Sequence, residues 1–269
     1  ADISWNMTKR TMSIAEDKIV LNVISNYLDV VMASNNLEHA RKKADVAQYD
    51  YWVATLHMGV GNISDSDIIL AQKSCDMAKK AIDNAELDLE RAMLNFNYAL
   101  GVSPECKWVL TEESEYNVLE LLSLDAEINK IMKLSPAIWS ADQYVHLANL
   151  QLDLHSWNDP MSEPYRAKQI DVIKAELGAA ETKEQMRNAI RTIYTAIKQI
   201  EESIDLMQNQ LVIADERLRV AKVNYDLGII TLAEIKKAEL GLREIEKEIK
   251  HLEYEHAKLK LSFEKPWAA

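Results

Sequence analysis

Glycine and proline are scarce in this sequence, which has 6 Gly and 5 Pro among its 269 residues. Average usage would supply roughly 32 of the two together. The prolines stand at positions 104, 136, 160, 164 and 266, so residues 1–103 and 165–265 contain none. Because proline breaks the interior of a helix, these two proline-free arms predict long helices.

Other shortages narrow the class of protein further. Phenylalanine occurs only twice, and a hydrophobic fraction of 48% with 28% charged residues excludes a disordered chain. No apolar run approaches the roughly 20 residues of a membrane helix. The first residues lack the features of a signal peptide, so we expect one to be absent or already removed. The net charge of −12 argues against a nucleic-acid surface, which needs clustered basic residues.

What the sequence does contain is an internal repeat. The stretches 61–71 and 228–238 share glycine at the first position, a hydroxyl residue at +3, an acid at +6, isoleucine at +7 and alanine at +10. The distance from Gly61 to Gly228, 167 residues, also aligns Tyr27 with Tyr194, Val53 with Val220 and Leu94 with Leu261. A register held over roughly 70 residues implies duplicated helices of equal length.

Each copy predicts an antiparallel helical hairpin that turns at its glycine. Apolar residues on both sides of the turn follow steps of four and three, the spacing of a coiled-coil seam, as in Ile193, Ile197, Ile200, Ile204, Met207 and Leu211. Ser64 and Thr231 are suitable helix N-caps, with Asp67 and Glu234 three residues later as capping-box acids. Cys75 falls on the seam of the first copy, which favours a buried, inert thiol, and Cys106 lies too far along the chain to bridge it.

A third apolar row widens the face of each hairpin. It has seven-residue spacing in the second copy, at Leu206, Ile213, Val220 and Leu227, and is matched by Val46, Val53 and Val60 in the first. A single hairpin does not need so wide an apolar face. The row therefore predicts neighbours on two sides, as in a bundle or a closed helical barrel.

The segment between the hairpins predicts two shorter helices, at 118–134 and 137–155, followed by a loop at 156–164, and no convincing strand appears anywhere. The expected fold is all-α: two long antiparallel coiled-coil hairpins with a short-helix segment between them. We expect one domain over 1–269, with the first repeat at about 12–101, the connecting segment at 102–164 and the second repeat at about 165–264.

Catalytic and metal-binding patterns are weak. Glu253 and His256 match the Glu-x-x-His motif of four-helix di-metal proteins, but the motif occurs once, and the repeat counterpart of His256 is Leu89. No nucleophile motif, phosphate loop or cysteine cluster is present in the sequence. We therefore expect neither an enzyme nor a metal or other cofactor.

The duplicated pattern Gly-x-x-(Ser/Thr)-x-x-(Asp/Glu)-Ile-x-x-Ala, with Ala99-Leu100-Gly101 ending the first copy, resembles the TolC or outer membrane efflux protein family. The resemblance covers nearly the whole chain and includes Ser135-Pro136-Ala137-Ile138, which is similar to the family's equatorial segment. It implies a homotrimer whose helices form a tunnel, with an efflux adaptor or inner-membrane pump component bound at the hairpin tips. It also implies two strands of an outer-membrane barrel per repeat. A membrane strand takes about 9–11 residues, so the loop at 156–164, where the two strands of the second repeat would lie, is too short for both. We therefore expect the strands to be absent from this chain.

The resemblance places a set of candidate residues at the tip of the tunnel. The turns are Gly61 and Gly228, Glu234 matches an acid of the pore constriction, and Tyr225 and Asp67 match a tyrosine and its acidic partner. Helix capping and seam packing are the alternative roles of these acids and of this tyrosine. The chain departs from the family at Lys237, where the family has a second acid.

The sequence thus predicts an exported, cell-envelope protein that forms or contributes to a helical conduit for efflux. The alternative is a coiled-coil scaffold or adaptor without a channel that binds helices of a partner protein.

Overall fold

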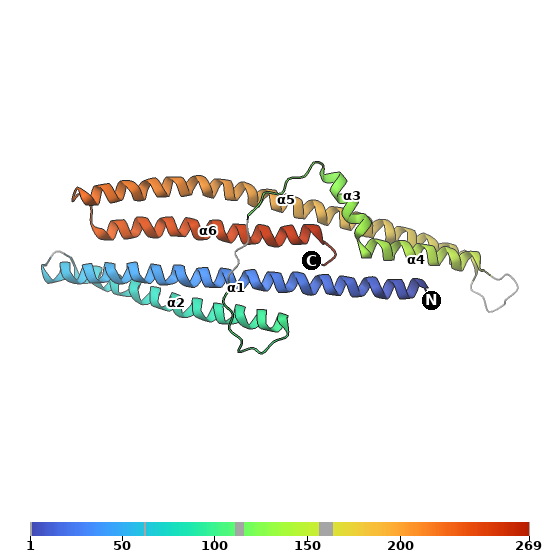
Figure 1. The fold of residues 1–269 in the computed structure, drawn as a ribbon, viewed down its shortest axis with the longest axis horizontal. Coiled ribbons are helices and arrows are strands. Elements are labelled where there is room, and N and C mark those ends of the chain that lie inside the picture. Colours follow the sequence, from blue (N-terminus) through green and yellow to red (C-terminus); the bar gives the residue numbers. More distant parts are fainter. Residues whose placement is uncertain (1, 62, 111–115, 156–163, 269) are drawn as a thin grey trace. The chain divides into compact units, whose positions relative to one another are not determined.

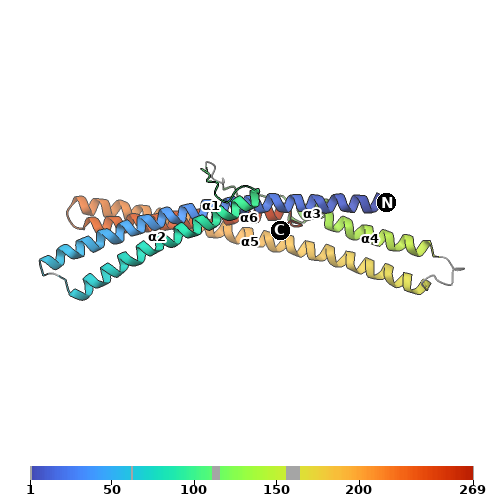
Figure 2. The ribbon, with the colours of Figure 1, turned by 90° about the horizontal axis from the view of Figure 1, so that it is seen from below.

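The computed structural model describes residues 2–61, 63–110, 116–155 and 164–268. These residues form six helices and no strand: α1 (Asp2–Gly59), α2 (Asp65–Leu100), α3 (Leu124–Leu134), α4 (Pro136–Asp153), α5 (Tyr165–Asp226) and α6 (Leu232–Glu264). The all-α class and the two long hairpins, α1 with α2 and α5 with α6, are confirmed (Figure 1). Figure 2 shows the antiparallel course of each pair from a second side.

Helix boundaries differ from expectation at two places. Helix α1 begins at Asp2 rather than near residue 12, and nothing in the first eleven residues breaks a helix. Helix α3 begins at Leu124 rather than at 118, because the Ser123 hydroxyl accepts a hydrogen bond from the Ala126 amide at 3.4 Å and caps the helix there. The expected loop at 156–164 lies outside the described residues except for Pro164.

The chain divides into two compact units, and α1, α5 and α6 contribute to both. Unit 1 comprises Ala1–Leu21, Asn117–Lys198 and Lys258–Ala269, and unit 2 comprises Asn22–Tyr116 and Gln199–Ala257. Each unit has a hydrophobic core of its own.

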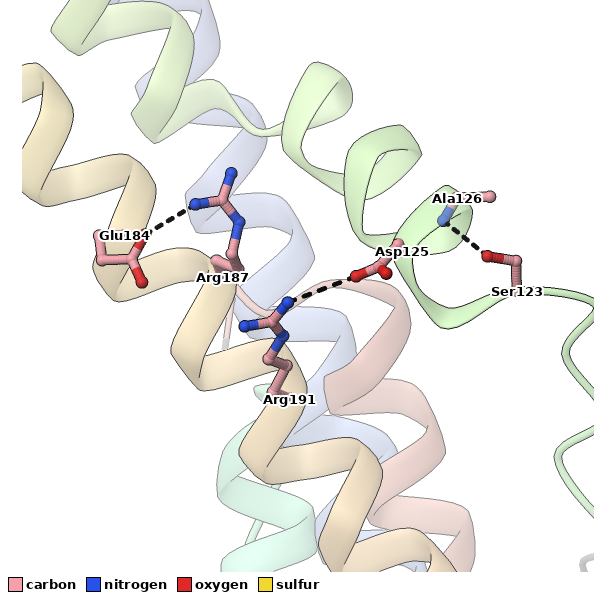
Figure 3. A network of polar contacts seen from close by, with 6 residues as sticks. All are labelled: Ser123, Asp125, Ala126, Glu184, Arg187 and Arg191. Atoms are coloured by element: carbon pink, nitrogen blue, oxygen red, sulfur yellow. Dashed lines mark hydrogen bonds and ion pairs between the residues drawn. The ribbon is translucent and has the colours of Figure 1, made fainter.

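Unit 1 is built around α3, α5 and the end of α6. Its core contains Ile128, Ile131, Ile190, Ile197 and Phe263, all nearly inaccessible to solvent. Polar contacts surround this core: Arg191 of α5 lies 3.4 Å from Asp125 of α3, and Arg187 forms an ion pair with Glu184 one helical turn away (Figure 3). Helix α3 is therefore held to α5 by apolar packing with an exposed ion pair beside it.

Unit 2 is a row of four helices in which α1 and α6 are the inner pair. Tyr27 of α1 contacts Phe96 of α2 edge to face, with ring centroids 6.0 Å apart. Tyr254 of α6 is buried against Leu28 and Val31 of α1, and its hydroxyl accepts a hydrogen bond from Asn35. On the other side, α6 contacts α5 through Lys222 and Glu239. Helices α2 and α5 therefore end the row in the contacts described for unit 2.

The predicted coiled-coil seam is partly confirmed by burial. Ile197, Ile204, Ala214 and Leu218 are buried on α5 at successive spacings of seven, ten and four residues, all of which fall on the predicted seam. Cys75 is a buried free thiol on the equivalent seam of α2, and Cys106 is free as well. Seam packing within each hairpin thus leaves the third apolar row for other contacts.

Candidate functional site

The first hairpin turn combines a left-handed glycine with a complete capping box. Gly61 has φ +74°, and its amide donates to the carbonyl of Met58 at 3.0 Å. The Ser64 hydroxyl accepts from the Asp67 amide, and the Asp67 carboxylate accepts from the Ser64 amide at 3.2 Å and the Ser64 hydroxyl at 2.7 Å. The predicted turn and cap are confirmed, and the Asp67 carboxylate is engaged in capping its own helix.

The second turn repeats this arrangement in part. Gly228 has φ +72° and donates to the carbonyl of Tyr225 at 2.8 Å, while the Ile229 amide donates to the carbonyl of Asn224. These two bonds satisfy carbonyls at the end of α5, as in a Schellman motif. The Glu234 carboxylate then accepts from the Thr231 amide at 2.8 Å and the Thr231 hydroxyl at 3.2 Å. Glu234 therefore also serves as a capping acid.

The structure does not pair the candidate tyrosine with its expected acid. Tyr225 is about two-fifths exposed on α5, and within the described residues Asp67 hydrogen-bonds to Ser64 rather than to Tyr225. Both Asp67 and Glu234 remain exposed to solvent beside their turns. Each can contribute negative charge to the surface of the hairpin tip while it caps a helix.

Contacts that sequence reasoning missed join the two hairpins near the turns. Lys237 of α6 lies 3.1 Å from Asp50 of α1, and the Lys236 ammonium lies 5.2 Å from the centre of the Tyr49 ring. The residue that replaces the expected second acid thus forms an ion pair across the α1–α6 contact. The sequence shows that Asp50 and Lys237 have opposite charges, but it does not show that they meet. Their contact depends on the register of α1 against α6.

Large apolar side chains surround both turns. Val60, Ile69 and Leu70 are exposed at the first turn, and Leu227 and Ile229 at the second. Exposed apolar groups gathered at one end of a helical protein mark a contact surface more often than a solvated tip.

His256 of the Glu253–His256 motif makes a buried hydrogen bond with Glu201 of α5. His256 is 2% exposed, and its Nε2 lies 3.1 Å from the Glu201 carboxylate of α5. Its ring packs edge to face on Tyr116, and burial together with the nearby Glu201 charge raises the pKa of that tyrosine. No group of three or more potential metal-binding side chains occurs in the described part of the chain.

None of the helices formed by residues 2–61, 63–110, 116–155 and 164–268 combines the length and the apolar character needed to cross a membrane.

Comparisons with known proteins identify the fold. No protein-family model and no curated protein matches the chain. Among solved structures, the chain is similar to CusC, with a TM-score of 0.70 at 17% identity over 99% of this chain and 72% of that one. It is also similar to the CmeC outer membrane channel of Campylobacter jejuni, with a TM-score of 0.67 at 14% identity over 99% of this chain and 66% of that one. The outer membrane protein VceC of Vibrio cholerae gives a TM-score of 0.68 at 13% identity over 100% of this chain and 74% of that one.

These similarities confirm the fold predicted from the duplicated turns. The chain has the fold of the helical part of TolC-like outer membrane efflux channels, and the resemblance covers its whole length. It spans between 66% and 74% of the three proteins compared. At identities below 20% a shared fold carries no functional residue with it, so the role of each side chain has to be argued from this structure.

Proposed function

We propose that this chain is a component of an efflux or export conduit in the cell envelope and that three copies assemble through their free helix edges into a closed tube. The proposal describes a transport component without catalytic activity. The observation that supports it most is a correspondence between the contact inside one chain and the exposed rows at its two edges.

The contact inside the chain joins α1 to α6. His39 and Lys43 of α1 lie 4.0 and 3.8 Å from Glu244 of α6, and Asp50 pairs with Lys237. On α1, this face includes the predicted third row, where Val46 and Val53 are partly buried. Repeat 1 therefore directs Val46 and Val53 of its third row toward repeat 2, while Val60, next to the turn, stays exposed.

The residues equivalent to this contact in the other repeat, 167 positions away, lie on the free edges of α5 and α2. On α5, the counterparts of His39, Val46, Val53 and Val60 are the apolar residues Leu206, Ile213, Val220 and Leu227, which are 44–68% exposed. On α2, the counterparts of Lys236, Lys237, Glu244 and Tyr254 are Ile69, Leu70, Met77 and Leu87, which are 54–67% exposed. Both edges thus present apolar side chains at the positions that meet inside the chain.

A second copy can satisfy both edges at once. If α5 of one copy packs on α2 of the next as α1 packs on α6, each junction repeats the internal one. A heterologous contact of this kind forms a closed ring when the rotation from copy to copy completes a full turn, which is one third of a turn for three copies. Burying one such Leu or Ile side chain contributes about 1.5–3 kcal/mol, so a row of four on each helix favours assembly.

The assembly is tested by the mass of the protein in solution. We expect the native chain to form trimers and the variant Ile213→Glu to be monomeric, because the variant buries an unpaired charge in the junction. Val212→Glu is the matched control: Val212 is 70% exposed against 53% for Ile213, and its counterpart in α1, Asp45, is already acidic. A native monomer at high concentration, or equal masses for the two variants, would contradict the proposal and favour the scaffold alternative.

The hairpin turns are the proposed meeting point with other pump components. Their exposed apolar residues fit a docking site for an adaptor or inner-membrane component, and Asp67, Glu234, Gly61, Gly228 and Tyr225 would surround the mouth of the tube. In a reconstituted assembly, Asp67→Asn with Glu234→Gln should reduce the preference for cations, whereas Asp83→Asn with Asp88→Asn on α2 should not. Equal ion preference in both variants would assign the two tip acids to helix capping alone.

A further inference from the structure

A cavity in unit 2 lies where α1, α5 and α6 come together, outside the hairpin turns. Its volume is about 400 Å³, within the range of small-molecule sites. Apolar side chains from all three helices line it, namely Val46, Leu218, Leu240 and Leu242. Leu218 is buried, and the other three are partly buried, so the apolar lining is recessed from the surface.

Basic side chains surround this apolar lining. Lys42 of α1, Lys222 of α5, and Lys236 and Arg243 of α6 all border the cavity. A second cavity of about 100 Å³ shares Lys42 and Arg243 and continues along α1 and α6 to Lys247 and Lys250. The two cavities together are bordered by six basic and four acidic side chains, in a chain that has 31 basic and 43 acidic residues.

Part of this positive charge is not neutralised by the protein. Lys42 and Lys247 form no ion pair with any described residue, and the Lys222 ammonium is 4.0 Å from Glu239, the limit of such a contact. Arg243 forms a solvent-exposed pair with Glu246 at 3.1 Å, and both residues border the second cavity. Lys42 lies at the junction of the two cavities and is available to a ligand.

His39 borders the second cavity, and its pKa is sensitive to the basic side chains around it. Its side chain is 12% exposed, and no described residue hydrogen-bonds to its Nε2, which lies 4.0 Å from the Glu244 carboxylate. Burial lowers the pKa of His39, and the Lys247 and Lys43 charges lower it further, while Glu244 opposes them. His39 is therefore neutral at pH 7, and protonation would become easier if an anion bound beside it.

We propose that this cavity binds an organic anion with an apolar body, whose charged group contacts Lys42 and Arg243 and whose apolar part lies against Leu218 and Leu242. Both parts of such a ligand have a matching surface. An organic cation of the same shape would meet uncompensated lysines, so the sign of the head group should decide binding. The site lies within one chain and does not require the trimer.

Calorimetry with two matched probes tests the sign of the charge. Decyl sulfate and decyltrimethylammonium carry the same tail, and each is added to the full chain below the concentration at which it forms micelles. We expect decyl sulfate to bind at least tenfold more tightly, the factor that 1.4 kcal/mol represents. Equal affinities, or no binding of decyl sulfate, would overturn the proposal.

Two double variants locate the binding. Lys42→Gln with Arg243→Gln should weaken decyl sulfate binding about tenfold or more, since two charge-assisted contacts are lost. Lys79→Gln with Lys80→Gln on α2 removes the same charge away from the cavity and should leave the affinity unchanged. Equal losses in the two variants would show attraction to the surface in general and would contradict the site.

The pKa of His39 supplies an independent readout by NMR, with the ring signals identified through His39→Gln. Bound decyl sulfate should raise this pKa, because an anion at Lys42 and Arg243, which border the same cavity as His39, opposes the Lys247 and Lys43 charges that lower it. A bound probe that leaves the His39 titration unchanged would lie elsewhere, and the proposed site would be wrong.

Discussion

At the scale of single residues, Asp17 ties the end of the chain to the first helix of unit 1. Its carboxylate accepts hydrogen bonds from the Lys265 ammonium at 2.6 Å and from the Trp267 indole at 3.0 Å, and its side chain is 18% exposed. These hydrogen bonds, with the nearby Lys265 charge, hold the pKa of Asp17 below its usual value. The contact therefore stabilises the fold only while the carboxyl is ionised.

The variant Asp17→Asn should lower the free energy of unfolding by about 1–2 kcal/mol at pH 7. Because the folded pKa is lowered, the contribution of Asp17 is present above its unfolded value of about 3.9 and is lost as the pH falls through the folded value. Thermal unfolding followed by circular dichroism should show a difference from the native chain that is largest near neutral pH and shrinks below about pH 4. Asp142→Asn, which breaks an exposed pair with Lys183, should cost less than about 0.5 kcal/mol.

Asn97 fixes the segment that follows α2. Its fully buried amide donates to the carbonyls of Pro104 and Cys106 at 3.0 and 2.8 Å, and its oxygen accepts from the Trp108 indole at 2.7 Å. Asn97→Ala should cost about 2–3 kcal/mol, because it leaves these groups without partners. The emission of Trp108, identified by comparison with Trp108→Phe, should shift to longer wavelength. Asn95→Ala, at an exposed position two residues earlier, should change neither property.

At the scale of helices and turns, replacing glycine should have opposite effects on stability in a turn and inside a helix. Gly228 has a positive φ, so Gly228→Ala should cost about 1 kcal/mol or more through backbone strain. Gly178 lies inside α5 with open space around its Cα, and Gly178→Ala should instead stabilise the chain by about 0.5–1 kcal/mol. Chemical unfolding of both variants measures the difference, and a stabilising Gly228→Ala would contradict the assigned turn.

The elements that the sequence predicted well are those encoded by local signals. The glycine turns at Gly61 and Gly228 depend on backbone conformation and on caps three residues away, so their pattern can be read along the chain. The start of α3 was missed because Ser123 competes with a helical pattern that continues on both sides of it. The sequence thus predicted that this helix exists, but its first residue depended on the single hydroxyl of Ser123.

The contacts between hairpins could not be read in the same way. Asp50 meets Lys237, and Lys42 lies near Arg243, because of the register of α1 against α6, which many side chains determine jointly. The third apolar row was visible in the sequence, but its partner was not. Only the structure shows that Val46 and Val53 of repeat 1 are partly buried inside the chain, while their counterparts in repeat 2, Ile213 and Val220, are exposed.

At the scale of the whole molecule, the free edges of α2 and α5 are the strongest indication of function. Large Leu, Ile, Val and Met side chains are exposed in rows along these two edges, and apolar side chains gathered in this way mark a contact surface. Joining the edges of neighbouring copies buries them and reproduces a contact that the chain already makes. The proposed assembly therefore depends on the register of α5 in one copy against α2 in the next.

One measurement tests this register directly. The His39–Glu244 contact at 4.0 Å corresponds, through the repeat, to Leu206 of one copy beside Met77 of its neighbour. A chain carrying Leu206→Cys and Met77→Cys should therefore form disulfide-linked dimers and trimers under mild oxidation. A chain with Leu206→Cys and Asp88→Cys should not, since residue 88 lies on the same face of α2 but about 16 Å further along it. Cross-linking of both chains to the same extent, or of neither, would contradict the proposed assembly.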